Sequence, residues 1–168
     1  TAFKTCGFSV TIYPFILMDI VPGNGLPDPY GSAEQAAFPW RGRMTSPADM
    51  SAAVTADIDS FFGACAPSDF GEDTGQVTYS GPDEFSFRRF ILHYARLAQI
   101  AGGVERFVIG SEMRGLTTLR SSAGVYPCVA KLKILAADVR SILGAGTGLT
   151  YAADWSEYFG HHDGGDIA

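Results

Sequence analysis

Carboxylate side chains follow three apolar segments of this sequence, at positions where they could do chemistry. Asp19 closes the run YPFILMD, Glu112 follows RFVIGS, and Asp154 follows LTYAA, with Glu157 three residues further on. Propensity and packing disfavour an acid inside or directly after a buried strand, so each is either solvated or functional. Carboxylates gathered at one place could transfer protons or bind sugar hydroxyls.

Each acid also has a plainer explanation. Asp19 is equally consistent with capping the PGNG turn that follows it, and Asp154 with bracing the loop around Trp155. Glu157 is typical of a solvated loop acid. Glu112 is the strongest functional candidate, because it lies just past an apolar strand, after small residues that leave space in front of it. Arg114 could pair with Glu112 or position a substrate.

Aromatic residues occur in the same predicted loops as these acids. They are Tyr30, Trp40, Trp155 and Tyr158. Flat rings beside carboxylates are typical of sugar-binding clefts, where they stack against pyranose faces. Taken alone, Trp40 and Trp155 are equally consistent with covering the rim of a fold.

The first half of the chain predicts a strand, a long loop and a helix. The strand lies within residues 8–20, after a glycine that ends a short helix. The loop from about 21 to 45 is rich in Pro and Gly, and its length makes it a candidate binding loop. Ser46 and Pro47 then open a helix predicted over 47–62. Residues of about 63–83 form an inserted loop or hairpin with the β-like patch QVTY.

The second half predicts two further helices and two further strands. A helix is expected over 83–101, a strand over 105–110, a helix from Pro127 that ends at Gly144, and a strand beginning at Leu149. Loops are expected from Glu112 to Tyr126 and after Trp155. Strands that alternate with helices predict an α/β fold with a parallel sheet. If that fold is a (β/α)₈ TIM barrel, which needs about 250 residues, residues 1–168 cover only part of it.

Composition limits the classes of partner. Eighteen acids against twelve bases give a net charge of −6, which argues against a nucleic-acid-binding surface. The longest apolar run is interrupted by Asp19 and is too short for a membrane span. No GxGxxG, GxxxxGK[ST] or GxSxG motif occurs, so neither a nucleotide cofactor nor a serine hydrolase is indicated.

The cysteines and histidines do not predict a metal site. Three widely separated cysteines, Cys6, Cys65 and Cys128, are best explained as small packing residues. His161 and His162 are adjacent in a Gly-rich segment, where a solvated loop is the expected state. We therefore expect neither a metal nor any other cofactor.

Four longer motifs carry a resemblance to a known family. They are YPFILMDIVPGNGLPDPYG, FPWRGRM, FVIGSEMRGLTTLR and LTYAADWSEYFG. In this order, across residues 8–160, they resemble the TIM-barrel-like, glycoside-hydrolase-related domain of large tail proteins from gene transfer agents and related phages. The resemblance implies a baseplate or tail-tip protein of a phage-like particle, made in the bacterial cytoplasm. Its implied partners are other tail proteins and a cell-envelope glycan or peptidoglycan.

The same resemblance gives Glu112 a role. IGSEM is similar to the Asn-Glu motif on strand four of retaining glycosidase barrels, in which the Glu is the general acid/base. Ser111 stands where those enzymes have the Asn that contacts the sugar 2-hydroxyl. Their nucleophile comes from strand seven, which would lie beyond Ala168. Substrate-binding roles would then fall to Asp19, Trp40, Arg114, Asp154, Trp155 and Glu157.

Two alternatives remain open at this point. The chain could be a purely structural tail domain whose site is vestigial, or it could come from a free-standing retaining glycosidase. A retaining enzyme needs two carboxyls about 5–5.5 Å apart, and only one candidate is visible in this sequence.

Overall fold

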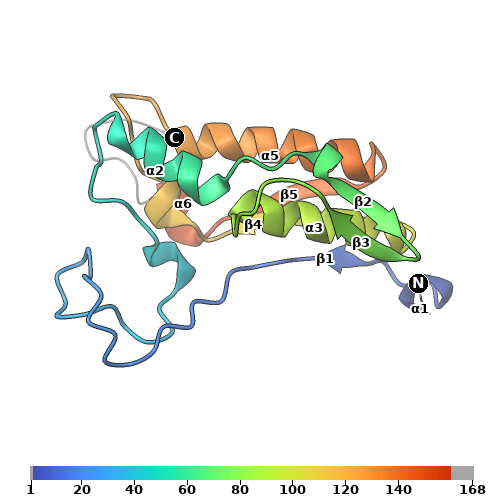
Figure 1. The fold of residues 1–168 in the computed structure, drawn as a ribbon, viewed down its shortest axis with the longest axis horizontal. Coiled ribbons are helices and arrows are strands. Elements are labelled where there is room, and N and C mark those ends of the chain that lie inside the picture. The colour runs from blue at the N-terminus through green and yellow to red at the C-terminus, as the bar shows by residue number, and fades with distance from the viewer. Residues whose placement is uncertain (1, 160–168) are drawn as a thin grey trace. The chain divides into compact units, whose positions relative to one another are not determined.

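The computed structural model describes residues 2–159 and has an α/β fold (Figure 1). The chain forms two compact units, which are described separately. The first contains residues 1–14, 59–110 and 130–152, and the second contains 15–58, 111–129 and 153–168. The helices are α1 (Ala2–Thr5), α2 (Ala53–Phe62), α3 (Phe87–Ile100), α4 (Arg114–Thr117), α5 (Pro127–Leu143), α6 (Trp155–Phe159) and the 3₁₀ turns η1 (Arg41–Arg43) and η2 (Pro67–Asp69). The strands are β1 (Thr11–Ile12), β2 (Phe70–Asp73), β3 (Gln76–Tyr79), β4 (Arg106–Ser111) and β5 (Gly148–Ala152).

A three-stranded sheet in the order β1-β4-β5 lies in the first unit. β1 pairs with β4 in parallel, with Thr11 opposite Arg106 and Ile12 opposite Phe107. The residues of β4 after Arg106 are all buried, as expected for a strand that is covered on both faces. The predicted α/β class with a parallel sheet is therefore confirmed, and the described strands do not close a barrel.

The strand predicted within residues 8–20 is wrong for most of its length. Only Thr11 and Ile12 form a ladder, and Pro14 directly afterwards lacks the N–H that would continue it. No described strand pairs with residues 15–20, and Phe15 and Leu17 are 51% and 74% exposed. Asp19 is exposed and does not close a strand.

The helix predicted over 47–62 begins only at Ala53. Residues 47–52 form turns instead, because Met50 adopts a left-handed φ of 62°. Its N–H donates to the Arg120 carbonyl at 2.7 Å, and the Asp49 carboxylate accepts from the Arg120 backbone N–H at 2.7 Å. These two long-range hydrogen bonds take the place of the first helical turns. Local helix propensity contains no information about them.

The helix α3 and the hairpin β2–β3 pack together in the first unit (Figure 1). The hairpin confirms the QVTY strand, which pairs antiparallel with Phe70–Asp73. α3 starts at Phe87, later than predicted, because Ser86 is its N-cap and accepts a bond from the Arg89 N–H. α5 has its predicted bounds and is followed by Gly144 at a φ of 76°.

Two short helices replace parts of the predicted loops. α4 occupies Arg114–Thr117, within the loop expected from Glu112 to Tyr126, and α6 occupies Trp155–Phe159. Both are one or two turns long, which is too short for hydrophobic periodicity to indicate a helix. No helix among the described residues is long and apolar enough to cross a membrane.

The cysteines follow the expected pattern at two of three positions. Cys65 and Cys128 are buried free thiols, and burial raises their pKa values to about 11 and about 12. Cys6 is exposed, so its interpretation as a packing residue is wrong.

Glu84 accepts a set of hydrogen bonds that joins the end of α2 to the start of α3. Its carboxylate accepts from the backbone N–H groups of Ala64 and Cys65 and from the Ser86 hydroxyl, at 2.7–3.1 Å. Burial alone would raise the pKa of Glu84, but these bonds outweigh it and lower the pKa to about 2.

We expect Glu84→Gln to lower the free energy of unfolding by about 1–2 kcal/mol at pH 7, because two backbone N–H groups and the Ser86 hydroxyl would lose a charged acceptor. The folded pKa lies below the ordinary value of 4.5, so the stabilisation is complete above that value and is lost as the pH falls towards 2. Urea denaturation at pH 7 and near pH 2 measures both effects. The neighbouring Asp83→Asn, which changes an exposed acid, is the control. An equal loss from both variants would contradict the role of Glu84.

Candidate functional site

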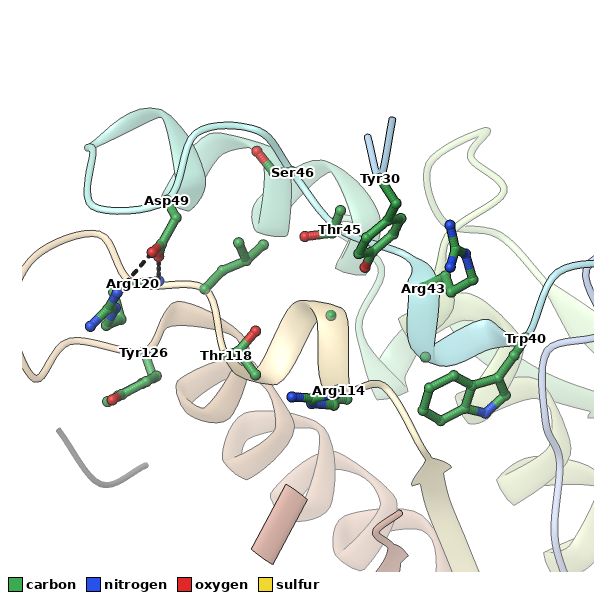
Figure 2. A pocket seen from close by; sticks show the side chains of 13 residues that line it. Tyr30, Trp40, Arg43, Thr45, Ser46, Asp49, Arg114, Thr118, Arg120 and Tyr126 are labelled. Carbon is green, nitrogen blue, oxygen red and sulfur yellow. Dashed lines mark hydrogen bonds and ion pairs between the residues drawn. The ribbon is translucent and has the colours of Figure 1, made fainter. Parts of the chain in front are cut away.

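A pocket of about 500 Å³ lies entirely within the second unit. Its wall comes from the loop before η1, from η1 itself, from the turns before α2, and from α4 with the loop that follows it (Figure 2). The lining residues are Tyr30, Trp40, Gly42, Arg43, Thr45, Ser46, Asp49, Arg114, Gly115, Thr118, Leu119, Arg120 and Tyr126. Residues with aromatic rings, hydroxyls and guanidinium groups therefore line the same pocket.

The pocket depends on the close approach of α4 to the backbone after η1. A Cβ atom at Gly115 would lie 2.3 Å from the Met44 carbonyl oxygen and 2.8 Å from that of Gly42. Only glycine allows backbone segments to come this close. α4 and η1 are thereby held together, and both contribute lining residues.

Glu112 holds Trp40 and Arg41 in place beside the pocket. The Trp40 indole Nε1–H donates to Glu112 Oε2 at 2.9 Å, and Arg41 Nη2 lies 2.7 Å from the same oxygen. Arg41 Nε also donates to the Ser111 hydroxyl at 2.8 Å. The carboxylate therefore fixes the orientation of a pocket-lining indole, although Glu112 does not itself line the pocket.

Two further features of Glu112 bear on a chemical role. Its backbone φ is 52°, a left-handed conformation that costs free energy in residues other than glycine and that often marks functional positions. Its second oxygen, Oε1, accepts no bond from the described residues.

The Trp40 ring also depends on Gly42. A Cβ atom there would lie 2.4 Å from two atoms of the indole six-membered ring. We expect Gly42→Ala to push the indole away from Glu112, which should shift Trp40 fluorescence to longer wavelength and lower stability by about 1 kcal/mol. The measurement uses a Trp155→Phe background, in which Trp40 is the single tryptophan of this sequence. An unchanged emission spectrum would contradict the contact.

Arg43 and Arg120 are each held by a carboxylate and lie near an aromatic ring. The Arg43 guanidinium lies 4.1 Å from the Tyr30 ring centroid, and Arg43 Nη2 is 3.3 Å from Asp28 Oδ2. Arg120 Nη2 lies 2.9 Å from Asp49 Oδ2, and this bond is the main cause that lowers the pKa of Asp49. Figure 2 shows the Asp49–Arg120 pair next to Tyr126.

Asp154 and Glu157 cap helix α6. Asp154 Oδ2 accepts from the Ser156 N–H at 3.0 Å, while Glu157 Oε2 accepts from the Asp154 N–H at 2.7 Å. Asp154 is therefore the N-cap acceptor of α6, and the Glu157 side chain returns to the Asp154 N–H. Hydrogen bonding from the Ser156 hydroxyl is the main cause that lowers the pKa of Asp154. Thr117 also donates to Glu157 Oε1 at 3.0 Å, which connects α4 to α6.

The structure brings together only some of the residues singled out from the sequence. Trp40, Arg114 and Tyr30 line the pocket, and Glu112 contacts it through Trp40. Asp19, Asp154, Trp155 and Glu157 do not line it, and Trp155 is 77% exposed. The substrate roles of these four residues remain predictions.

Several pocket residues were missed, namely Arg43, Thr45, Ser46, Asp49, Thr118, Leu119, Arg120 and Tyr126. Arg43 and Arg120 belong to the motifs FPWRGRM and FVIGSEMRGLTTLR, whose recurring basic residues were an available signal. The others are brought together by long-range contacts, namely the approach of Gly115 to the Met44 carbonyl and the hydrogen bonds between Asp49 and Arg120.

No group of three or more His, Cys, Asp or Glu among the described residues could hold a metal ion. His161 and His162, for which we expected a solvated loop and no metal, lie outside the described residues.

Comparison with known families identifies the chain. A family model described as GTA TIM-barrel-like domain, where GTA denotes gene transfer agent, matches residues 85–168, which is half of the chain. The chain belongs to this family. The match includes Glu112, Arg114 and the elements from α3 to α6. No curated protein matches the chain.

Membership of the GTA TIM-barrel-like family points to a component of a gene transfer agent, which is a phage-like particle. The matched region contains α4 and the loop after it, which form one wall of the pocket, whereas Trp40 and Arg43 lie before it.

Proposed function

We propose that this GTA TIM-barrel-like domain binds cell-envelope glycan, as part of a baseplate or tail-tip protein of a gene transfer agent particle. In this role it would contact other tail proteins and hold polysaccharide or peptidoglycan during attachment and DNA delivery. The observation that carries the proposal is the pocket in the second unit, with an indole fixed at its edge.

The pocket has the chemistry that saccharides require. Tyr30, Trp40 and Tyr126 supply aromatic rings, and Thr45 and Thr118 supply hydroxyls, whereas the Ser46 hydroxyl already donates to Asp57. Sugars present an apolar face that stacks on aromatic rings and a rim of hydroxyls that needs polar partners. The volume of about 500 Å³ lies within the range of about 300–1,000 Å³ that is typical of small-molecule sites.

Glycan binding is tested with the complete parent protein and with purified envelope material. We expect saturable co-sedimentation with peptidoglycan sacculi or saturable binding to soluble envelope polysaccharide, measured by calorimetry. An unrelated acidic protein of similar size is the control for non-specific attraction. Absence of binding to every envelope fraction would contradict the proposal.

Cleavage is a second candidate activity. It is favoured by the left-handed backbone of Glu112 and by its Oε1, which accepts no bond from the described residues and could act in proton transfer. A retaining hydrolase also needs a second carboxylate. Among the described lining residues the single carboxylate is Asp49, which is paired with Arg120. A nucleophile would therefore have to be a carboxylate outside the described lining of this pocket.

If the domain cleaves glycan, Glu112→Gln should lower product formation by about 100-fold or more, because the general acid/base is lost. The same glutamate-to-glutamine change at Glu72, on the exposed hairpin, is the matched control and should leave the rate unchanged. Reducing sugar released from envelope glycan measures both. Equal product from Glu112→Gln and the unaltered protein would remove Glu112 from catalysis.

A purely structural tail domain is favoured by other contacts of the same acids. Asp154 and Glu157 both accept backbone hydrogen bonds at the start of α6, and Glu112 is ion-paired with Arg41. Such contacts are what a vestigial site would retain. The binding measurement separates this alternative from the proposal, because a structural domain should show no glycan affinity. A free-standing retaining glycosidase would instead turn over glycan without any tail partner.

A further inference from the structure

The pocket carries an excess of positive charge, although the chain as a whole is acidic. Its described lining holds three guanidinium groups, from Arg43, Arg114 and Arg120, and one carboxylate, from Asp49. The sequence has a net charge of −6. Positively charged lining residues attract anions into the pocket, while the acidic remainder of the chain repels them. The pocket is therefore suited to a negatively charged ligand.

The guanidinium groups are distributed along the pocket instead of being gathered at one point. Figure 2 shows Arg120 with Tyr126 at one end, Arg114 in the middle, and Arg43 with Tyr30 towards the other end. Each end therefore combines a cation with an aromatic ring. This arrangement suits a ligand in which sugar rings and acidic groups occur together.

Two of the arginines have carboxylate neighbours that lie outside the lining. Arg43 is 3.3 Å from Asp28, and Arg114 interacts electrostatically with Asp154. Neither Asp28 nor Asp154 lines the pocket. Arg120 differs, because its partner Asp49 is itself a lining residue. An anion inside the pocket would therefore meet Arg43 and Arg114 without facing their carboxylate neighbours.

We propose that the pocket selects anionic saccharides over neutral ones. Carboxylate or phosphate oxygens of the ligand accept bonds from Arg114 and Arg43, while a sugar ring stacks on Trp40. Guanidinium groups suit either anion, because their paired N–H donors match two oxygens at once. The proposal rests on the proposed function and narrows the class of glycan.

The test compares two matched pairs of oligosaccharides by calorimetry on the complete chain. Chitotetraose is paired with a peptidoglycan tetrasaccharide whose muramic acid residues carry free lactyl carboxylates. Mannopentaose is paired with mannopentaose phosphate. We expect an anionic member to bind at least about ten-fold more tightly than its neutral partner at 50 mM NaCl, and the difference to shrink at about 0.5 M because salt screens the charges.

Arg114→Gln and, separately, Arg43→Gln should remove most of this preference while the neutral sugars keep their affinity. Arg106→Gln makes the same charge change on an exposed residue outside the pocket and should leave the preference intact. Discrimination within only one pair would identify carboxylate or phosphate as the recognised group. Equal affinity within both pairs, or an equal loss from Arg106→Gln, would overturn the proposal while saccharide binding stands. Failure of all four sugars to bind would overturn this proposal, whereas the proposed function falls only if no envelope fraction binds.

Discussion

Gly115→Ala is expected to lower the free energy of unfolding by about 2–3 kcal/mol, the range of a severe overpacking change. The added methyl would lie 2.3 Å from the Met44 carbonyl oxygen, which is a backbone atom that cannot rotate away. Glycine-to-alanine changes in helices normally stabilise by about 0.5–1 kcal/mol. We therefore expect Gly115→Ala to destabilise the protein, whereas helix propensity alone predicts that the same change in α4 would stabilise it.

Urea denaturation measures this change, and Gly146→Ala is the matched control. A Cβ atom at Gly146 would meet no atom within 4 Å, and its backbone is not left-handed. That variant should be as stable as the unaltered protein or slightly more so, because alanine reduces the entropy of the unfolded chain. A Gly115→Ala variant of equal or greater stability would show that α4 does not lie against the 42–44 backbone.

Trp40→Ala is expected to weaken saccharide binding by about 30-fold or more, equivalent to about 2 kcal/mol. Trp40 lines the pocket, and its orientation is set by the 2.9 Å bond to Glu112, so its ring is ready to stack before a ligand arrives. Trp155 is 77% exposed and does not line the pocket, so Trp155→Ala should have a smaller effect.

Trp40→Phe separates the two contributions of the indole. It keeps a ring face but loses the Nε1–H that donates to Glu112, so we expect an intermediate affinity. Thermal unfolding of each variant checks that the fold is retained. A larger loss from Trp155→Ala than from Trp40→Ala would move the binding surface away from this pocket and towards α6.

The elements that the sequence predicted well are those whose signals are local. β4 is a continuous apolar run, and α5 has helical periodicity, a proline at its start and Gly144 at its end. The hairpin β2–β3 has strand residues around the turn Thr74–Gly75. In these segments the preferred local conformation agrees with the tertiary structure.

The mispredicted elements depend on contacts that local patterns do not contain. The segment after Pro14 has the composition of a strand but pairs with no described strand. The start of α2 is displaced because the Met50 N–H and the Asp49 carboxylate bind the backbone of Arg120, about seventy residues away along the chain. The periodicity of apolar residues along the sequence gives no sign of these long-range hydrogen bonds.

The candidate site was predictable in its centre but not at its edges. The position of Glu112 after a buried strand predicted a functional side chain, a role that stays a prediction, and Trp40 and Arg114, which line the pocket, were named with it. The contact of Glu112 with Trp40 joins residues 72 positions apart and was not evident from the sequence. The arginines at the two ends were missed, because each reaches the pocket through a carboxylate partner in another segment, Asp28 or Asp49.

The claim that this pocket is the saccharide site is tested most directly by an amide and indole NMR titration of the chain. The ligand is the peptidoglycan tetrasaccharide. The account predicts shift changes concentrated at the Trp40 indole N–H and at the backbone N–H groups of Gly42, Gly115, Thr118 and Arg120. Shift changes confined to residues outside the pocket, for example to the hairpin β2–β3, would contradict it.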